Sequence, residues 1–139
     1  MKARIVNFDN KYSTEIKSIR TQVFVEEQGI DSAIDFDGLD EEAIHVLIDV
    51  QGNAIGTGRI LDDGHIGRIA VLKNYRSRGV GALILKTIIA EAKKCDFKCV
   101  YLGSQLPAVG FYKKLGFKTR GEVFIDAGLE HIEMELLLE

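Results

Sequence analysis

The stretch VLKNYRSRGVGALI, residues 71–84, decides the fold because it joins an apolar run to an amphipathic segment through a loop of arginine and glycine. After the loop, apolar residues recur at helical spacing and predict a helix over residues 79–94. The flanking runs HIGRIAVL at 65–72 and KCVYLGS at 98–104 are typical of strands. A strand, a long helix and a strand in this order predict one parallel, right-handed crossover unit.

The rest of the chain adds strands and shorter helices on both sides of this unit. Further strands are expected in 3–8, 43–50, 54–61, 121–125 and 131–138, helices in 13–27 and 108–117, and an acidic loop with one helical turn in 29–43. Ser13 is available to cap the first helix, and Gly116 ends the last one. The order predicts an α/β fold with a mixed central sheet of six to seven strands flanked by about four helices.

The length and charge of the chain limit the number of domains and the classes of partner to expect. The 139 residues fit one domain, taken here as 1–139, and the net charge of -3 with a pI near 5.7 argues against a general nucleic-acid binder. Acidic residues dominate 21–58, which contains no Lys or Arg, whereas 64–120 carries twelve Lys or Arg and two acids. Two interpretations stay open: two solvated faces, or a cationic substrate that meets an anionic cofactor.

Targeting and metal signals are absent from the sequence. No apolar stretch is long enough to cross a bilayer, and the N-terminus MKARIVNFDN has no signal-peptide core, so we expect a cytoplasmic protein without a membrane partner. Cys95 and Cys99 have no second cysteine pair and no clustered histidines beside them. We interpret both as free thiols and expect no metal site.

The loop at 76–81 has the chemistry of an anion site. Gly79 and Gly81 open the long helix, whose first backbone N–H groups lack intrahelical acceptors, and Arg76 and Arg78 add fixed positive charge. A diphosphate is the expected ligand, and the alternative is a tight turn with solvated charge. A dinucleotide G-x-G-x-x-G after the first strand and a nucleotide-binding GK[ST] are both absent.

Two motifs together carry a family resemblance. R-x-x-G-x-G at 76–81 and the FY-x-x-x-GF pattern within AVGFYKKLGF, residues 108–117, resemble the GNAT superfamily of N-acetyltransferases. RTQVFVEEQ, DFD, HIGRIAV, YLGSQ and FIDAGLEHIEM are similar to its ElaA/YjcF-like branch. The resemblance implies direct acetyl transfer from acetyl-CoA to a primary amine of a small molecule or peptide (EC 2.3.1.-). The alternative is a CoA-binding or regulatory module of this fold without significant turnover.

The resemblance also implies how acetyl-CoA binds. The diphosphate is expected on the backbone N–H groups of 77–81 and on the two arginines, with pantetheine between the strands ending near 69–71 and near 102–104. The N–H near Val71 would polarise the thioester carbonyl. The expected cofactor-binding residues are Ile69, Ala70, Val71, Arg76, Ser77, Arg78, Gly79, Val80, Gly81, Gln105, Phe111 and Tyr112.

Three residues are candidates for proton transfer. Tyr112 is the expected donor to the departing thiolate, since a phenol of pKa about 10 is close to a thiol of about 8.5; otherwise it is a core aromatic. Glu27 and His131 are the candidate proton acceptors, although Glu27 is also explained as a solvated helix end paired with Arg20. The sequence leaves open the acceptor amine, the choice of base, the physiological role and whether the last strand pairs between chains as a homodimer.

Overall fold

The computed structural model describes residues 1–138 and contains seven strands in two sheets with four α-helices. The strands are β1 (Lys2–Val6), β2 (Ile44–Val50), β3 (Asn53–Ile60), β4 (Ile66–Val71), β5 (Cys99–Gln105), β6 (Lys118–Asp126) and β7 (Leu129–Leu137). The helices are α1 (Tyr12–Arg20), α2 (Ser32–Asp35), α3 (Val80–Lys94) and α4 (Val109–Lys114). The expected α/β architecture, with its strand number and helix number, is confirmed.

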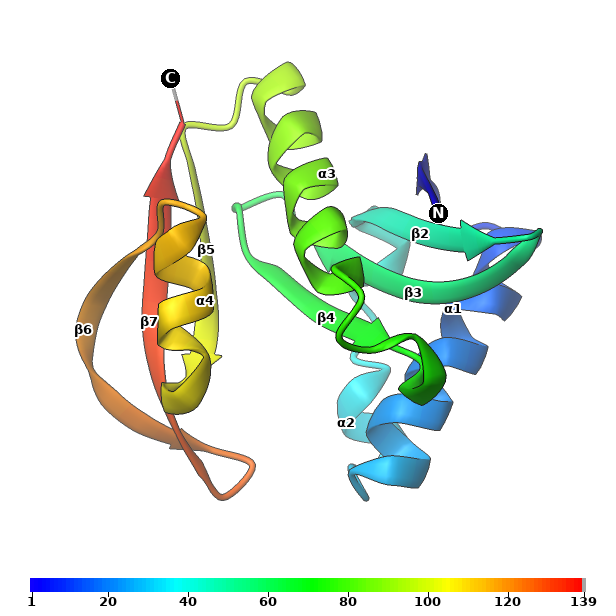
Figure 1. The fold of residues 1–139 in the computed structure, drawn as a ribbon, viewed down its shortest axis with the longest axis horizontal. Coiled ribbons are helices and arrows are strands. Elements are labelled where there is room, and N and C mark those ends of the chain that lie inside the picture. The colour runs from blue at the N-terminus through cyan, green and yellow to red at the C-terminus, as the bar shows by residue number, and fades with distance from the viewer. Residues whose placement is uncertain (139) are drawn as a thin grey trace.

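The sheet is divided at the crossover unit. Strands β1–β2–β3–β4 form one antiparallel sheet in this order, and β5–β7–β6 form the second. Within residues 1–138 a single parallel bridge, between His65 and Tyr101, joins them. From that bridge β4 and β5 run apart, so that the sheets stand separated on either side of α3 in Figure 1. The edges of β4 and β5 therefore carry backbone groups without a strand partner.

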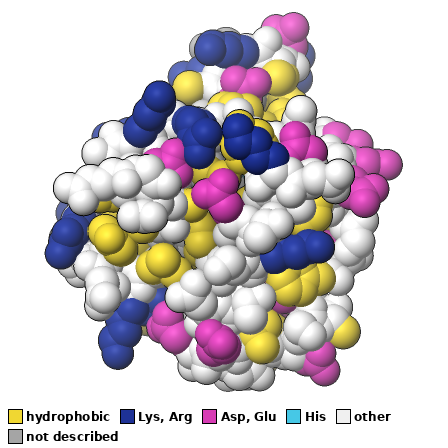
Figure 2. Space-filling view, turned by 90° about the vertical axis from the view of Figure 1, so that its right-hand side faces the viewer, with side chains coloured by type: hydrophobic (Ala, Val, Ile, Leu, Met, Phe, Trp, Pro, Cys, Tyr) yellow, Lys and Arg dark blue, Asp and Glu magenta, His cyan; other side chains and the backbone are white. Residues whose placement is uncertain are grey.

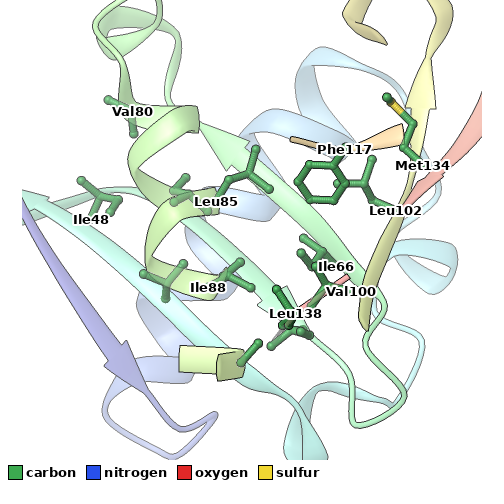
Figure 3. Packing of buried hydrophobic residues seen from close by; sticks show 14 of the residues in the cluster. Ile48, Ile66, Val80, Leu85, Ile88, Val100, Leu102, Phe117, Met134 and Leu138 are labelled. Atoms are coloured by element: carbon green, nitrogen blue, oxygen red, sulfur yellow. The ribbon is translucent and has the colours of Figure 1, made fainter. Parts of the chain in front are cut away.

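Helix α3 holds the two sheets together through its side chains. Its buried face packs in one apolar cluster with residues of both sheets, several of which are labelled in Figure 3. Ile48 and Ile66 come from the first sheet, and Val100, Leu102 and Met134 come from the second. Burying a side chain of this size contributes about 1.5–3 kcal/mol, so this core compensates for the missing backbone ladder. A smaller cluster lies under α1.

The N-terminal helix differs from its prediction in two respects. The carboxylate of Asp9, rather than Ser13, accepts hydrogen bonds from the N–H groups of Lys11 and Tyr12, so the predicted cap is wrong. After Arg20 the helix widens into a π-helical segment, η1 (Thr21–Glu27). Such segments are rare and occur frequently at functional sites. Here η1 carries Glu27 at its end.

The 3₁₀ turns complete the connections. They are η2 (Asp40–Glu42), η3 (Lys73–Tyr75) and η4 (Leu106–Ala108). The expected acidic loop with one helical turn contains α2 and η2. The turn η3 connects β4 to the arginine and glycine loop at the start of α3.

Candidate active site

The loop before α3 presents a row of free backbone donors. Ser77 and Gly79 have positive φ angles of 63° and 80°, and Gly79 is the residue that caps α3 without a side-chain hydrogen bond. Within residues 1–138 the N–H groups of 77–81 donate no hydrogen bond. Successive N–H groups in left-handed and helical conformations form an anion-binding concavity. This concavity also lies at the positive end of a fifteen-residue helix.

The peptide groups of Val71 point into the opening between β4 and β5. Leu72 donates its N–H to the carbonyl of Ile55 in β3, at 2.9 Å. Because backbone groups of successive strand residues face opposite edges, the N–H and C=O of Val71 face away from β3. The Nε of Arg76 donates to this C=O at 2.9 Å, which fixes its direction. The end of β4 thus offers an N–H toward the space between the sheets.

Arg76 and Glu27 form a two-point ion pair. Arg76 Nη1 and Nη2 donate to Glu27 Oε2 and Oε1 at 2.9 and 2.7 Å. This hydrogen bond from Arg76, helped by the charges of Arg76 and Lys73, holds the pKa of Glu27 below its ordinary value. The sequence assigned the two side chains to different tasks, and the structure binds them to each other. Arg20, the alternative partner for Glu27, instead contacts Asp35 and Asp40.

Arg78 differs from Arg76 in its surroundings. Its guanidinium lies over the ring of Tyr75, with 5.6 Å between the guanidinium carbon and the ring centroid. Among residues 1–138 it forms no ion pair with a carboxylate. Arg78 is exposed beside the free N–H groups, so it can approach an anion bound there.

Tyr112 lies on α4 in a largely apolar environment. Its ring meets those of Phe111 and Phe117 edge to face, with centroids 5.1 and 5.9 Å apart. Burial raises the pKa of the Tyr112 hydroxyl, and no hydrogen bond to another of residues 1–138 lowers it again. The phenol therefore stays protonated in the neutral range, as a proton donor requires. Phe111 is exposed.

His131 lies on the second sheet and faces the open side of that sheet. In the ladder between β5 and β7 it is opposite Gln105, and its ring stacks with that of Phe124 at 5.8 Å between centroids. Its Nδ1 is 2.9 Å from the carbonyl of Leu129. No hydrogen bond or ion pair in the described chain joins Tyr112, Glu27 and His131 to one another.

The remaining expected residues differ in their surroundings. Ile69 and Val71 pack toward α3, and Ala70 belongs to the cluster beneath α1. Val80 is buried in the main core, so it can contribute only its backbone N–H to a ligand. Gln105 is exposed at the end of β5. These residues thus come from β4, the end of β5 and the start of α3.

A largely buried network of charges was not predicted from the sequence. Arg20 donates to the carboxylates of Asp35 and Asp40, at 3.2 and 2.6 Å, and Arg59 to Asp40 at 2.8 Å. Arg59 and Arg68 both donate to Asp37, and Arg68 also donates to the carbonyl of Asp35 at 3.1 Å. The acidic segment is thereby fastened to β3 and β4. The interpretation of the charge segregation as two solvated faces is wrong for these residues.

The signal for this network was present in the sequence. Asp35, Asp37 and Asp40 recur closely in a segment without bases, while Arg59 and Arg68 lie inside strand-like runs. A charged residue in a buried strand needs a partner. The three aspartates were therefore candidate partners for Arg59 and Arg68.

Comparison with known proteins supports a single family. The acetyltransferase (GNAT) domain family matches residues 10–138. The chain belongs to the GNAT acetyltransferase family. It is 37% identical over 120 residues to the uncharacterised N-acetyltransferase YjcF of Bacillus subtilis, covering 84% of this chain and 86% of YjcF. These matches confirm the GNAT resemblance and make the chain an N-acetyltransferase.

Solved structures show the same fold in this GNAT branch. Escherichia coli ElaA is 25% identical, with a TM-score of 0.87 over 97% of this chain and 99% of ElaA. An acyl-CoA N-acyltransferase of Pseudomonas aeruginosa is also 25% identical, with a TM-score of 0.87 over 96% and 97% of the two chains. The ElaA/YjcF-like branch predicted from the sequence is therefore confirmed.

Metal-ligand clusters and membrane-spanning helices are both absent from the described residues. Residues 1–138 contain no group of three or more His, Cys, Asp or Glu side chains placed to hold a metal ion. No helix in the same range is both long and apolar enough to cross a membrane.

Proposed function

We propose that this GNAT domain, taken as residues 1–139, binds acetyl-CoA along the opening between β4 and β5 and transfers the acetyl group directly to a primary amine of a small molecule or peptide. The observation that supports it most is the row of unpaired N–H groups at 77–81. These donors lie at the N-terminus of α3, in the loop that follows β4, and β4 has an edge without a strand partner.

The proposed chemistry uses four sets of groups of this chain. The N–H groups of 77–81 and Arg78 bind the diphosphate, and the N–H of Val71 stabilises the developing oxyanion. The amine nitrogen forms its bond to the acetyl carbon as the carbon–sulfur bond breaks. Tyr112 gives a proton to the thiolate, and His131 is the proton acceptor to be tested first. Because Arg76 binds Glu27, we do not assign that carboxylate as the base.

The binding step is tested by calorimetry with CoA on the wild type and on Gly79→Val. A Cβ at Gly79 meets no protein atom within 4 Å, so it would project into open space beside the donors. The φ of 80° adds strain, so the thermal midpoint of each variant is measured as well. We expect CoA binding to be lost in a folded Gly79→Val. Unchanged affinity would contradict the placement of the diphosphate.

Turnover is tested by release of free thiol from acetyl-CoA across a panel of amines. A protein that binds CoA but releases no thiol above background with any amine would instead be a module without turnover. A cytoplasmic location belongs to the same proposal. The proposal does not include binding of nucleic acid. On the face of the molecule drawn in Figure 2, acidic and basic side chains are intermixed.

A further inference from the structure

We infer that Glu27 is a positioning residue that holds Arg76, and through it the diphosphate loop and the end of β4, in the geometry that receives acetyl-CoA. This inference rests on the proposed function. It assigns Glu27 a task other than proton transfer. The carboxylate acts through Arg76 and needs no contact with either substrate.

The first support is the geometry of Arg76. Its side chain returns from the loop to the end of β4, where Nε donates to the carbonyl of Val71 at 2.9 Å. Its two terminal nitrogens donate to the two oxygens of Glu27 at 2.9 and 2.7 Å. A guanidinium bound at three nitrogens has one orientation. Arg76 therefore joins three separate segments: η1, the end of β4 and the loop before α3.

The second support is the space beneath this contact. A hollow of about 350 Å³ lies between η1 and η3, lined by Gln22, Glu26, Glu27, Leu72, Lys73, Asn74 and Tyr75. Leu72 packs on the apolar cluster that contains Val23 of η1, but the hollow separates η1 from the turn η3 that follows. In the described part of the chain, the Glu27–Arg76 pair is the only side-chain hydrogen bond or ion pair between η1 and residues 72–79. The pair links η1 to the loop across this hollow.

The third support is the position of the held groups. The loop that follows Arg76 carries the free N–H groups of 77–81, and Val71 carries the N–H that faces the opening between the sheets. Arg76 lies between these two sets of donors in sequence, and its Nε donates to the carbonyl of Val71, the residue that carries the second donor. A shift of Arg76 would therefore alter their relative placement, which sets how well an extended thioester fits both.

A purely electrostatic role for Glu27 predicts the opposite change in CoA affinity, so the two roles can be distinguished. If Glu27 only neutralised Arg76, removing its charge would leave a freer cation beside an anionic ligand, and CoA would bind more tightly. If Glu27 positions Arg76, its removal loosens the loop and CoA binds more weakly. The sign of the change in affinity separates the two.

The experiment measures CoA affinity by calorimetry, without an amine, for wild type, Glu27→Gln, Arg76→Gln and the double variant. Glu26→Gln is the matched control, because Glu26 is adjacent and exposed and forms no ion pair among residues 1–138. We expect each single variant to weaken binding about three- to tenfold, and the double variant to bind no more weakly than Arg76→Gln alone, as coupled residues do. The control should stay within about twofold of wild type.

Steady-state kinetics supplies a readout that a general base would move differently. Glu27→Gln should raise the KM for acetyl-CoA while kcat at saturation stays within about threefold of wild type. A large loss of kcat with unchanged CoA affinity would restore Glu27 as the proton acceptor and overturn the inference. Equal or tighter CoA binding in Glu27→Gln would also overturn it. Failure of the wild type to bind CoA would instead refute the proposed function.

Discussion

Tyr112 carries the most direct prediction at the scale of single residues. Phe at this position keeps the ring that packs against Phe117 and removes only the hydroxyl. We expect Tyr112→Phe to lower thiol release about 10²-fold, the contribution of a general acid, with CoA affinity unchanged. Because burial raises the pKa of Tyr112, the wild-type rate should not decline through its ionisation until above about pH 10. Turnover equal to wild type in Tyr112→Phe would remove it from the mechanism.

Single residues were predictable where a motif places them and unpredictable where a partner lies far along the chain. The glycines and arginines of the loop belong to a recognisable motif at a helix start, where backbone N–H groups lack intrahelical acceptors. The pairing of Arg76 with Glu27 spans 49 positions, and both side chains are equally suited to other partners. Only the packing of η1 beside η3 brings them together. The sequence could therefore name these residues but not their relationship.

The packing of α3 on β3 gives a prediction at the scale of elements. A Cβ added to Gly58 would lie 2.7 Å from Ile84 Cγ2 and 3.3 Å from Ile69 and Ile88 side-chain carbons. Relief requires α3 to move away from the sheet, so we expect Gly58→Ala to cost about 1–3 kcal/mol. Urea unfolding measures the loss. Gly67→Ala in β4 is the control, since no atom lies within 4 Å of its added Cβ; equal midpoints for both variants would contradict the close approach.

Elements were predictable because their periodicity is local. The apolar face of α3 and the alternation of the hairpin strands specified type and approximate bounds. Two features depend on tertiary contacts and were missed. The sheet is divided because, within residues 1–138, a single β-bridge, between His65 and Tyr101, joins the β4 side to β5. The greater length of β6 arises because a bulge between Arg120 and Phe124 lets pairing with β7 continue on both sides.

The buried charge network acts at the scale of the whole molecule, because it fastens the acidic segment to the first sheet. Arg20 is fully buried and pairs with Asp35 and Asp40. Two further arginines, Arg59 and Arg68, pair with these acids and with Asp37. Removing one member of a buried ion pair costs about 3–5 kcal/mol, so Arg20→Ala should unfold at much lower urea concentration. Lys17→Ala, on the exposed side of the same helix, is the control and should change little. If both variants lost similar amounts of stability, the network would not be what stabilises the fold.

The same network predicts how stability depends on pH. The hydrogen bond from Arg59 lowers the pKa of Asp37. His45 adjoins the network, with its Nε2 2.8 Å from the carbonyl of Asp40, and burial lowers its pKa. Both groups bind protons more readily in the unfolded chain, so folding is favoured at higher pH. We expect the urea midpoint to decline as the pH falls below about 6.5, through His45, and more steeply below about 4, through Asp37. Asp37→Asn should be less stable at pH 7 and lose part of the steep decline. A pH profile of Asp37→Asn that runs parallel to wild type down to pH 3 would show that the Arg59–Asp37 contact does not stabilise the fold.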